Sequence, residues 1–122
     1  MDGAARGWTW RAYPGLPAAA ALARRYVRRA MGYDPSLAEA AAQLVGELFA
    51  NAVTRTPSGL PGGVVHVGYE LHPGRVRVAV RDQGTGHGRD QFTLIERLAA
   101  DWGCLPDGNG RIVWAVPGPA QG

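Results

Sequence analysis

A carboxylate and an amide lie four residues apart in the segment 47–53, ELFANAV. If this segment is a helix, Glu47 and Asn51 share one face of it, beside an apolar stripe that includes Leu48 and Ala52. Polar groups so close to a core-facing stripe could line a pocket that holds a ligand. A solvated helix boundary explains the segment, taken alone, equally well.

A second group of candidate residues is the segment 82–86, DQGTG, which directly follows the apolar run VRVAVR. Asp82 at the end of a strand can accept a hydrogen bond from a ligand amine. Gly84 and Gly86 would let the backbone approach that ligand closely. A simple turn is the alternative, because a DxGxG pattern is weak by itself.

The first half of the chain predicts a strand and two helices, and the second helix carries Glu47 and Asn51. The alternating aromatic segment Trp8 to Tyr13 predicts a strand that ends at Pro14-Gly15. Residues 16–31 then read as a helix with Pro17 at its first position, closed by Gly32. Asp34-Pro35 is a second start signal, an N-cap followed by proline. From there to about Thr54, apolar residues at helical spacing predict a long helix: Leu37, Ala41, Leu44, Leu48 and Ala52.

The remainder of the chain predicts strands joined by tight turns. The strands cover 64–71, 75–81, 102–105 and 111–116, with a loop over 82–90 and a helix over 91–101. The Asn-Gly pair in 107–110 predicts a hairpin, because asparagine and glycine readily adopt a positive φ. The order β-α-α-β-β-α-β-β predicts an α+β fold. We expect a two-layer α/β sandwich, a mostly antiparallel sheet with helices on one face.

The chain has 122 residues, 46% hydrophobic and 19% charged, which suits a single domain over 1–122 with a frayed tail from Pro117. No apolar run reaches the roughly 18–20 residues of a membrane span, and residues 1–7 lack the apolar core of a signal peptide. Cys104 is the only cysteine, so nothing indicates an oxidising compartment. We therefore expect a cytoplasmic protein that does not bind membranes.

All 13 basic residues are arginine, and the net charge is +3. This charge permits an acidic partner, and Arg24, Arg25, Arg28 and Arg29 form a basic patch on the first helix that is either a solvated face or a contact surface. We expect no direct nucleic-acid binding, because no helix-turn-helix or stacking platform is evident. The histidines and Cys104 lack metal-ligand spacing.

A third piece is Trp102-Gly103 followed by 108–114, GNGRIVW, which alone is just a hairpin. In their order and spacing, this piece and segments 47–53 and 82–86 resemble the GHKL (HATPase_c) ATP-binding domain, whose fold is the Bergerat type of α/β sandwich. The closest resemblance is to the anti-sigma-factor serine kinases of actinobacteria. Segment 47–53 is similar to the N box of that family, and segment 82–86 to its G1 box. The resemblance implies that Asn51 coordinates Mg²⁺ on ATP and that Glu47 is the general base for a serine hydroxyl.

The same resemblance implies that Asp82 accepts a hydrogen bond from the adenine amino group, with Gly84 and Gly86 beside the base and ribose. Arg55 stands where many relatives carry histidine, and its charge could face phosphate. The lid and the glycines of the G2 box that the family carries are missing here: only a few residues separate Gly86 from the next helix, Arg89 and Gln91 stand where the G2 glycines belong, and Gly88 alone is left nearby. We expect Asp90 to cap the N–H groups at the start of the helix, which are the groups that would hold the phosphates. Its negative charge would repel the phosphates, and Arg89 would offset part of this repulsion.

Two functional hypotheses follow. The first is a regulatory ATP-binding protein that binds a sigma factor or an antagonist protein, with Mg-ATP-dependent serine phosphorylation of the antagonist if it still uses the nucleotide. The alternative is a nucleotide-free protein-binding module of the same fold without kinase activity. An edge strand or the aromatic first strand could also support a homodimer. The tryptophans are then residues either of the core or of the dimer interface.

Overall fold

The computed structural model of the chain describes residues 7–84 and 92–118. Within these ranges, three α-helices and five strands follow one another in the order that the sequence predicts, with a short 3-10 turn after the second helix. In chain order the elements are β1 (Trp8–Pro14), α1 (Ala19–Ala30), α2 (Pro35–Arg55), η2 (Pro57–Gly59), β2 (Val64–His72), β3 (Arg75–Asp82), α3 (Thr93–Leu98), β4 (Ala99–Asp107) and β5 (Gly110–Pro117).

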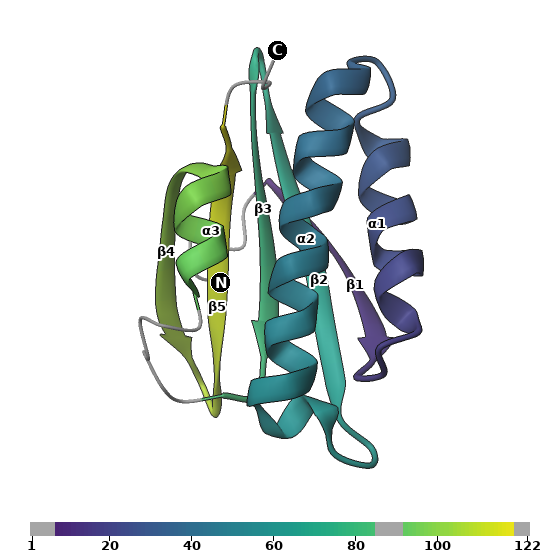
Figure 1. The fold of residues 1–122 in the computed structure, drawn as a ribbon, viewed down its shortest axis with the longest axis vertical. Helices are drawn as coiled ribbons and strands as arrows, with labels where there is room; N and C mark the ends of the chain where they lie inside the picture. Colours follow the sequence, from purple (N-terminus) through teal and green to yellow (C-terminus); the bar gives the residue numbers. More distant parts are fainter. Residues whose placement is uncertain (1–6, 85–91, 119–122) are drawn as a thin grey trace.

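The five strands form one sheet in the order β1-β2-β3-β5-β4, and every neighbouring pair is antiparallel. Figure 1 shows α1, α2 and α3 in a single layer on one side of this sheet. The predicted α+β sandwich with helices on one face is therefore confirmed. Its edge strands are β1 and β4, which contain Pro14 and Pro106.

The core lies between the sheet and α2. Because strand side chains alternate between the two faces, every second residue of β2 and β3 points toward the helices. Val65, Val67, Val76, Val78 and Val80 are almost completely buried there. They pack against the buried residues of α2, which include Leu44, Leu48, Phe49 and Ala52. This contact fixes which face of α2 is left half-buried or exposed.

The N-terminus of α2 forms as the sequence predicts. Asp34 is the N-cap, and its side chain accepts a hydrogen bond from the Leu37 N–H at 3.2 Å, with Pro35 at the first helical position. Helix α1 instead begins at Ala19, so the prediction that Pro17 starts the helix is wrong. The N–H groups of Ala19 and Ala20 bond to the carbonyls of Leu16 and Pro17, which places Pro17 in a turn that leads into the helix.

Helix α3 is shorter than predicted. It ends at Leu98, because residues from Ala99 onward pair with β5 instead of continuing the helix. A register irregularity between Ala99 and Asp101 accommodates the change. The predicted β4–β5 hairpin is confirmed, but the residue with positive φ is Gly108, at 59°, and not Asn109. Positive φ at the first central residue alone is the pattern of a type II′ turn, which suits a hairpin.

Candidate functional site

Glu47 and Asn51 lie on the same side of α2, as the helical spacing requires. Both are half-buried, beside the buried Leu48 and Ala52. Glu47 forms no salt bridge with any residue in 7–84 or 92–118. The exposed side chain of Arg55 occupies the last position of the same helix. The C-terminal half of α2 therefore presents a carboxylate, an amide and a cation within about two turns.

The segment after α2 ties this end of the helix to the end of β3. The Thr56 hydroxyl donates to the Ala52 carbonyl at 2.6 Å. Ser58 is completely buried, and its hydroxyl oxygen accepts a hydrogen bond from the Gln83 N–H at 2.9 Å. The Ser58 hydroxyl therefore stabilises the fold by joining the segment after α2 to the end of β3. This bond places residues 82–84 next to the segment that directly follows α2, near the C-terminal end of the helix that carries Glu47 and Asn51.

Asp82 is 1% exposed, at the end of the valine-bearing face of β3. Its partner is Arg111, which lies directly opposite on β5 and is 2% exposed. The Arg111 Nε is 3.0 Å from one carboxylate oxygen of Asp82 and 3.2 Å from the other. The Arg111 guanidinium also lies over the Phe92 ring, 5.2 Å from its centre, so it contacts both the carboxylate and an aromatic face.

Asp82 also accepts a hydrogen bond from the backbone two residues further on. The Gly84 N–H donates to the carboxylate at 2.8 Å. A Cβ at Gly84 would lie 2.8 Å from Thr56 and 2.9 Å from the Asp82 carboxylate, so a side chain there would break up this arrangement. The other predicted binding residues, Gly86, Gly88 and Arg89, lie outside the described residues.

The Asp82 carboxylate, which the resemblance assigns to the adenine amino group, thus accepts hydrogen bonds from Arg111 and Gly84 within the described residues. Sequence reasoning missed Arg111. One signal was available: the alternation that puts Val76, Val78 and Val80 on the core face also puts Asp82 there, and a carboxylate on that face needs a cation or a ligand.

Cys104 on β4 lies on the same face of the sheet as Asp82. Burial raises the pKa of its thiol, and the Asp82 charge adds to this shift, although Arg111 opposes it. Within the described part of the chain, no three histidine, cysteine, aspartate or glutamate residues gather as metal ligands. No helix among these residues is long and apolar enough to cross a membrane.

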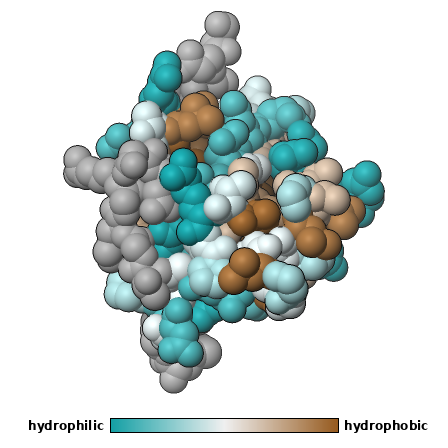
Figure 2. Space-filling model, turned by 60° about the horizontal axis from the view of Figure 1, so that its bottom comes forward, coloured by the Kyte–Doolittle hydropathy of each residue, from teal (hydrophilic) through white to brown (hydrophobic). Residues whose placement is uncertain are grey.

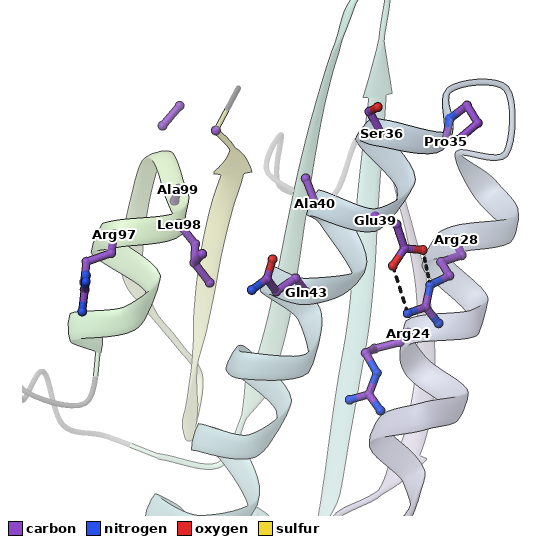
Figure 3. A pocket seen from close by; sticks show the side chains of 12 residues that line it. Arg24, Arg28, Pro35, Ser36, Glu39, Ala40, Gln43, Arg97, Leu98 and Ala99 are labelled. Carbon is purple, nitrogen blue, oxygen red and sulfur yellow. Dashed lines mark hydrogen bonds and ion pairs between the residues drawn. The ribbon is translucent and has the colours of Figure 1, made fainter. Parts of the chain in front are cut away.

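A concavity of about 800 Å³ lies beside the N-terminal half of α2. It is lined by Arg24 and Arg28 of α1, by Ser36, Glu39 and Gln43 of α2, and by Arg97 to Ala100 where α3 passes into β4, among others (Figure 3). Arg28 pairs with Glu39 at 2.7 Å. Arg24 lies over Gly46 and forms no salt bridge with the described residues. The concavity thus carries a net positive charge, and neither Glu47 nor Asn51 lines it.

The family model described as the histidine kinase-like ATPase domain matches residues 13–110. This range includes α2, β3 with Asp82, and β4, and it ends at the first residue of β5. No curated protein matches the chain.

Proposed function

This chain belongs to the family of histidine kinase-like ATPase domains, and from that premise we propose that it is an anti-sigma-type regulator that binds its partner protein without ATP. The partner is a sigma factor or an antagonist protein. The observation that carries the proposal is the buried Asp82–Arg111 ion pair, which uses the carboxylate that would otherwise select adenine.

Opening this pair for a ligand is expensive. Separating one partner of a buried ion pair leaves an uncompensated charge and costs about 3–5 kcal/mol. A ligand that would bind with micromolar affinity then binds at roughly millimolar, since each 1.4 kcal/mol is about tenfold. The loss of the G2 glycines from the sequence acts in the same direction, because the backbone cannot approach a phosphate as closely without them.

The basic concavity supports an acidic docking segment on the partner. Arg24 and Arg97 contribute positive charge with no salt bridge to the described residues, and the Arg28–Glu39 pair is exposed. Apolar lining from Leu98 and Ala99 gives this region the mixed character of a protein-binding groove.

A second candidate function is Mg-ATP-dependent serine phosphorylation of the antagonist. It is favoured by Glu47, which is half-buried without a salt bridge to the described residues and shares its helix face with Asn51. These are the positions of the base and the Mg²⁺ ligand that the resemblance implies.

Calorimetric titration with Mg-ATP separates the two candidates. We expect no binding up to millimolar nucleotide. Micromolar binding that is lost in Asn51→Ala would overturn the nucleotide-independent proposal and favour the kinase. Radiolabel transfer from ATP to a cognate antagonist would then test phosphorylation directly.

Partner binding is tested by pull-down with the sigma factors and antagonist proteins of the source organism, with and without Mg-ATP. We expect one partner to be captured equally in both conditions. Arg24→Glu should weaken capture, whereas the matched control Arg25→Glu should not, because Arg25 is an exposed residue of the same helix that does not line the concavity. Capture that requires ATP, or that Arg24→Glu leaves unchanged, contradicts this assignment.

A further inference from the structure

β1 is an edge strand with one open side. Among the described residues it pairs with β2 alone, from Trp8 to Pro14, and the register is regular throughout. In an antiparallel pair, alternate residues of a strand point their N–H and C=O groups away from the partner. β1 therefore presents a regular row of main-chain donors and acceptors, which is the feature that a further strand recognises.

The opposite edge of the sheet lacks this regularity. β4 contains Pro106, which has no N–H to donate, and its register shifts between Ala99 and Asp101. Prolines, irregularities and charges commonly protect an edge strand from further pairing. In β1 the only proline is the last residue, Pro14, so the residues before it remain able to pair.

The alternation along β1 assigns its side chains to the two faces of the sheet. Trp8 and Trp10 lie on the face that the helices leave uncovered, where they line a shallow concavity together with Trp114. Arg11 lies on the helix side, since its guanidinium is over the Tyr26 ring of α1, 5.1 Å from the ring centre. A strand added at this edge would thus place its side chains alternately beside tryptophan and beside arginine.

The helix side of this edge is positively charged. Tyr26 packs against Tyr69 of β2, with ring centres 5.4 Å apart, which determines the face of α1 that is turned toward β1. Leu22 and Arg29 share that face, four residues before Tyr26 and three after it, and both are exposed. Neither Arg11 nor Arg29 forms a salt bridge with any residue in 7–84 or 92–118. These two cations favour acidic side chains on the added strand.

A pocket of about 710 Å³ lies at the C-terminal end of β1. It is lined by Ala12, Pro14 and Leu16 from β1 and the turn after it, and by Leu60 and Val64 at the start of β2, among others. None of the described residues that line it is charged. Leu16 and Leu60 are 57% and 63% exposed, and Figure 2 shows hydrophobic side chains gathered on this end of the molecule. The pocket is therefore suited to an apolar side chain.

We propose that the open edge of β1 binds an extended segment of another protein, which adds to the sheet as a further antiparallel strand. This direction matches every other pairing in the sheet. Cross-strand neighbours lie on the same face, so the residue opposite Ala12 points its apolar side chain into the pocket, and the next residue, opposite Arg11, is acidic. This surface is separate from the basic concavity, and binding to it is independent of nucleotide.

The probe is a capped synthetic peptide with this pattern, acetyl-Leu-Ser-Leu-Glu-Val-Glu-Val-amide, titrated into the isotope-labelled chain and followed by NMR. We expect saturable binding that shifts the amide signals of β1 and of the pocket, and that protects alternate β1 amides from hydrogen exchange. Arg11→Glu should bind the peptide at least about tenfold more weakly. The matched control Arg75→Glu, an exposed arginine at the start of β3, should bind it like the unaltered chain.

Two N-methylated forms of the peptide keep the proposal testable without a variant. An antiparallel strand pairs through alternate N–H groups, so methyl groups on one alternate set should abolish binding, and methyl groups on the other set should leave it intact. Equal effects of the two sets overturn strand addition, and so does the absence of saturable binding up to millimolar peptide.

The site of binding separates this inference from the proposed function. If Arg24→Glu abolishes peptide binding and Arg11→Glu does not, the peptide occupies the basic concavity, and the assignment to the β1 edge is overturned. The proposed docking in the concavity would stand in that case. Conversely, binding at β1 that Arg24→Glu leaves unchanged supports a second, separate surface.

Discussion

Asp82 and Arg111 show how a single contact changes the chemistry of a site. Their side chains are 1% and 3% exposed, and 29 residues separate them along the chain. An ionised pair this deeply buried is stable only while both partners are present. The pair thus makes Asp82 part of the packing of β3 against β5, and this structural role competes with any ligand for the same oxygens.

Replacing Arg111 by leucine should lower the free energy of unfolding by about 3–5 kcal/mol, because it leaves the Asp82 carboxylate buried without a cation. The double variant Asp82→Leu, Arg111→Leu should recover most of that loss, since no charge remains to be compensated. Urea denaturation of the four proteins in this double-mutant cycle measures the coupling. Additive effects of the two substitutions would show that the pair does not interact in solution.

Glu70 predicts a dependence of stability on pH. Burial disfavours its charge, but the hydrogen bonds from His72 and Arg77 outweigh this and hold the pKa of the carboxyl below its ordinary 4.5. A carboxyl with a depressed folded pKa stabilises the fold above 4.5, and this contribution is lost as the pH falls through the folded value.

We therefore expect Glu70→Gln to be less stable than the unaltered chain at pH 7, with the difference shrinking below pH 4.5. Urea denaturation across this pH range, at a protein concentration held constant, measures it. A difference that is independent of pH would mean that Glu70 acts through packing alone.

At the residue scale, the sequence singles out Asp82 and the Glu47–Asn51 pair as candidate site residues. It does not reveal Arg111, the cation that pairs with Asp82. The periodicity of α2 determines which residues share a face, so Glu47 and Asn51 could be placed together from the sequence. The partner of Asp82 depends on the register of β3 against β5, which forms only when the chain closes over the segment between them. No local pattern specifies that register.

At the scale of elements, the start of α2 depends on one capping residue. Asp34→Ala should destabilise the fold by about 1 kcal/mol, because the Leu37 N–H loses its acceptor. Asp34→Asn retains an acceptor oxygen and should change stability by much less. Thermal unfolding of the three proteins tests this, and equal losses in both variants would assign the effect to charge near the helix N-terminus.

The turn after β1 makes a second prediction. A Cβ at Gly15 would lie 1.6 Å from the Ser58 carbonyl oxygen, so Gly15→Ala must push apart the β1–α1 turn and the segment after α2. We expect a loss of about 1–3 kcal/mol in the free energy of unfolding, by chemical denaturation.

Gly32→Ala is the control, since its Cβ would meet nothing nearer than 3.7 Å and it should be neutral or slightly stabilising. If both variants lose the same stability, crowding at Ser58 is not the cause.

Element boundaries were predictable where local signals decide them. The Asp34-Pro35 cap gave the start of α2 correctly, because the capping hydrogen bond spans only three residues. The end of α3 was wrong by three residues, because strand pairing with β5 competes with a helical pattern in Ala99 to Asp101 and wins. Pairing between strands is a property of the sheet, and it cannot be seen in the segment itself.

At the scale of the whole molecule, one core joins the two layers. Phe49 is completely buried and meets the Tyr13 ring of β1 edge-on, with ring centres 6.2 Å apart. Phe49→Ala should therefore lower the free energy of unfolding by about 3–5 kcal/mol. The loss should be the same by circular dichroism and by tryptophan fluorescence, because helices and sheet unfold together. Separate transitions would mean that the layers are independently stable.

The architecture was predictable because most segments of the chain show either the alternating apolar pattern of a strand or the apolar spacing of a helix, and these patterns give the order of the elements. Paired helices and hairpin-joined strands leave few arrangements, and an antiparallel sheet with one covered face is the simplest of these. What remained open was the uncovered face, since its tryptophans fit both a buried core and an exposed surface.

The pairing of β1 has a consequence for how the protein folds. Trp8 pairs with Glu70, and two helices lie between β1 and its partner strand in the sequence. The α1–α2 pair and the two hairpins close over short separations and so form quickly, whereas β1 must wait for a long loop to close. During synthesis β1 emerges well before its partner strand β2, with both α1 and α2 between them. Its two tryptophans are then without their partner strand until β2 has left the ribosome, which is the period in which a chaperone would have most to protect.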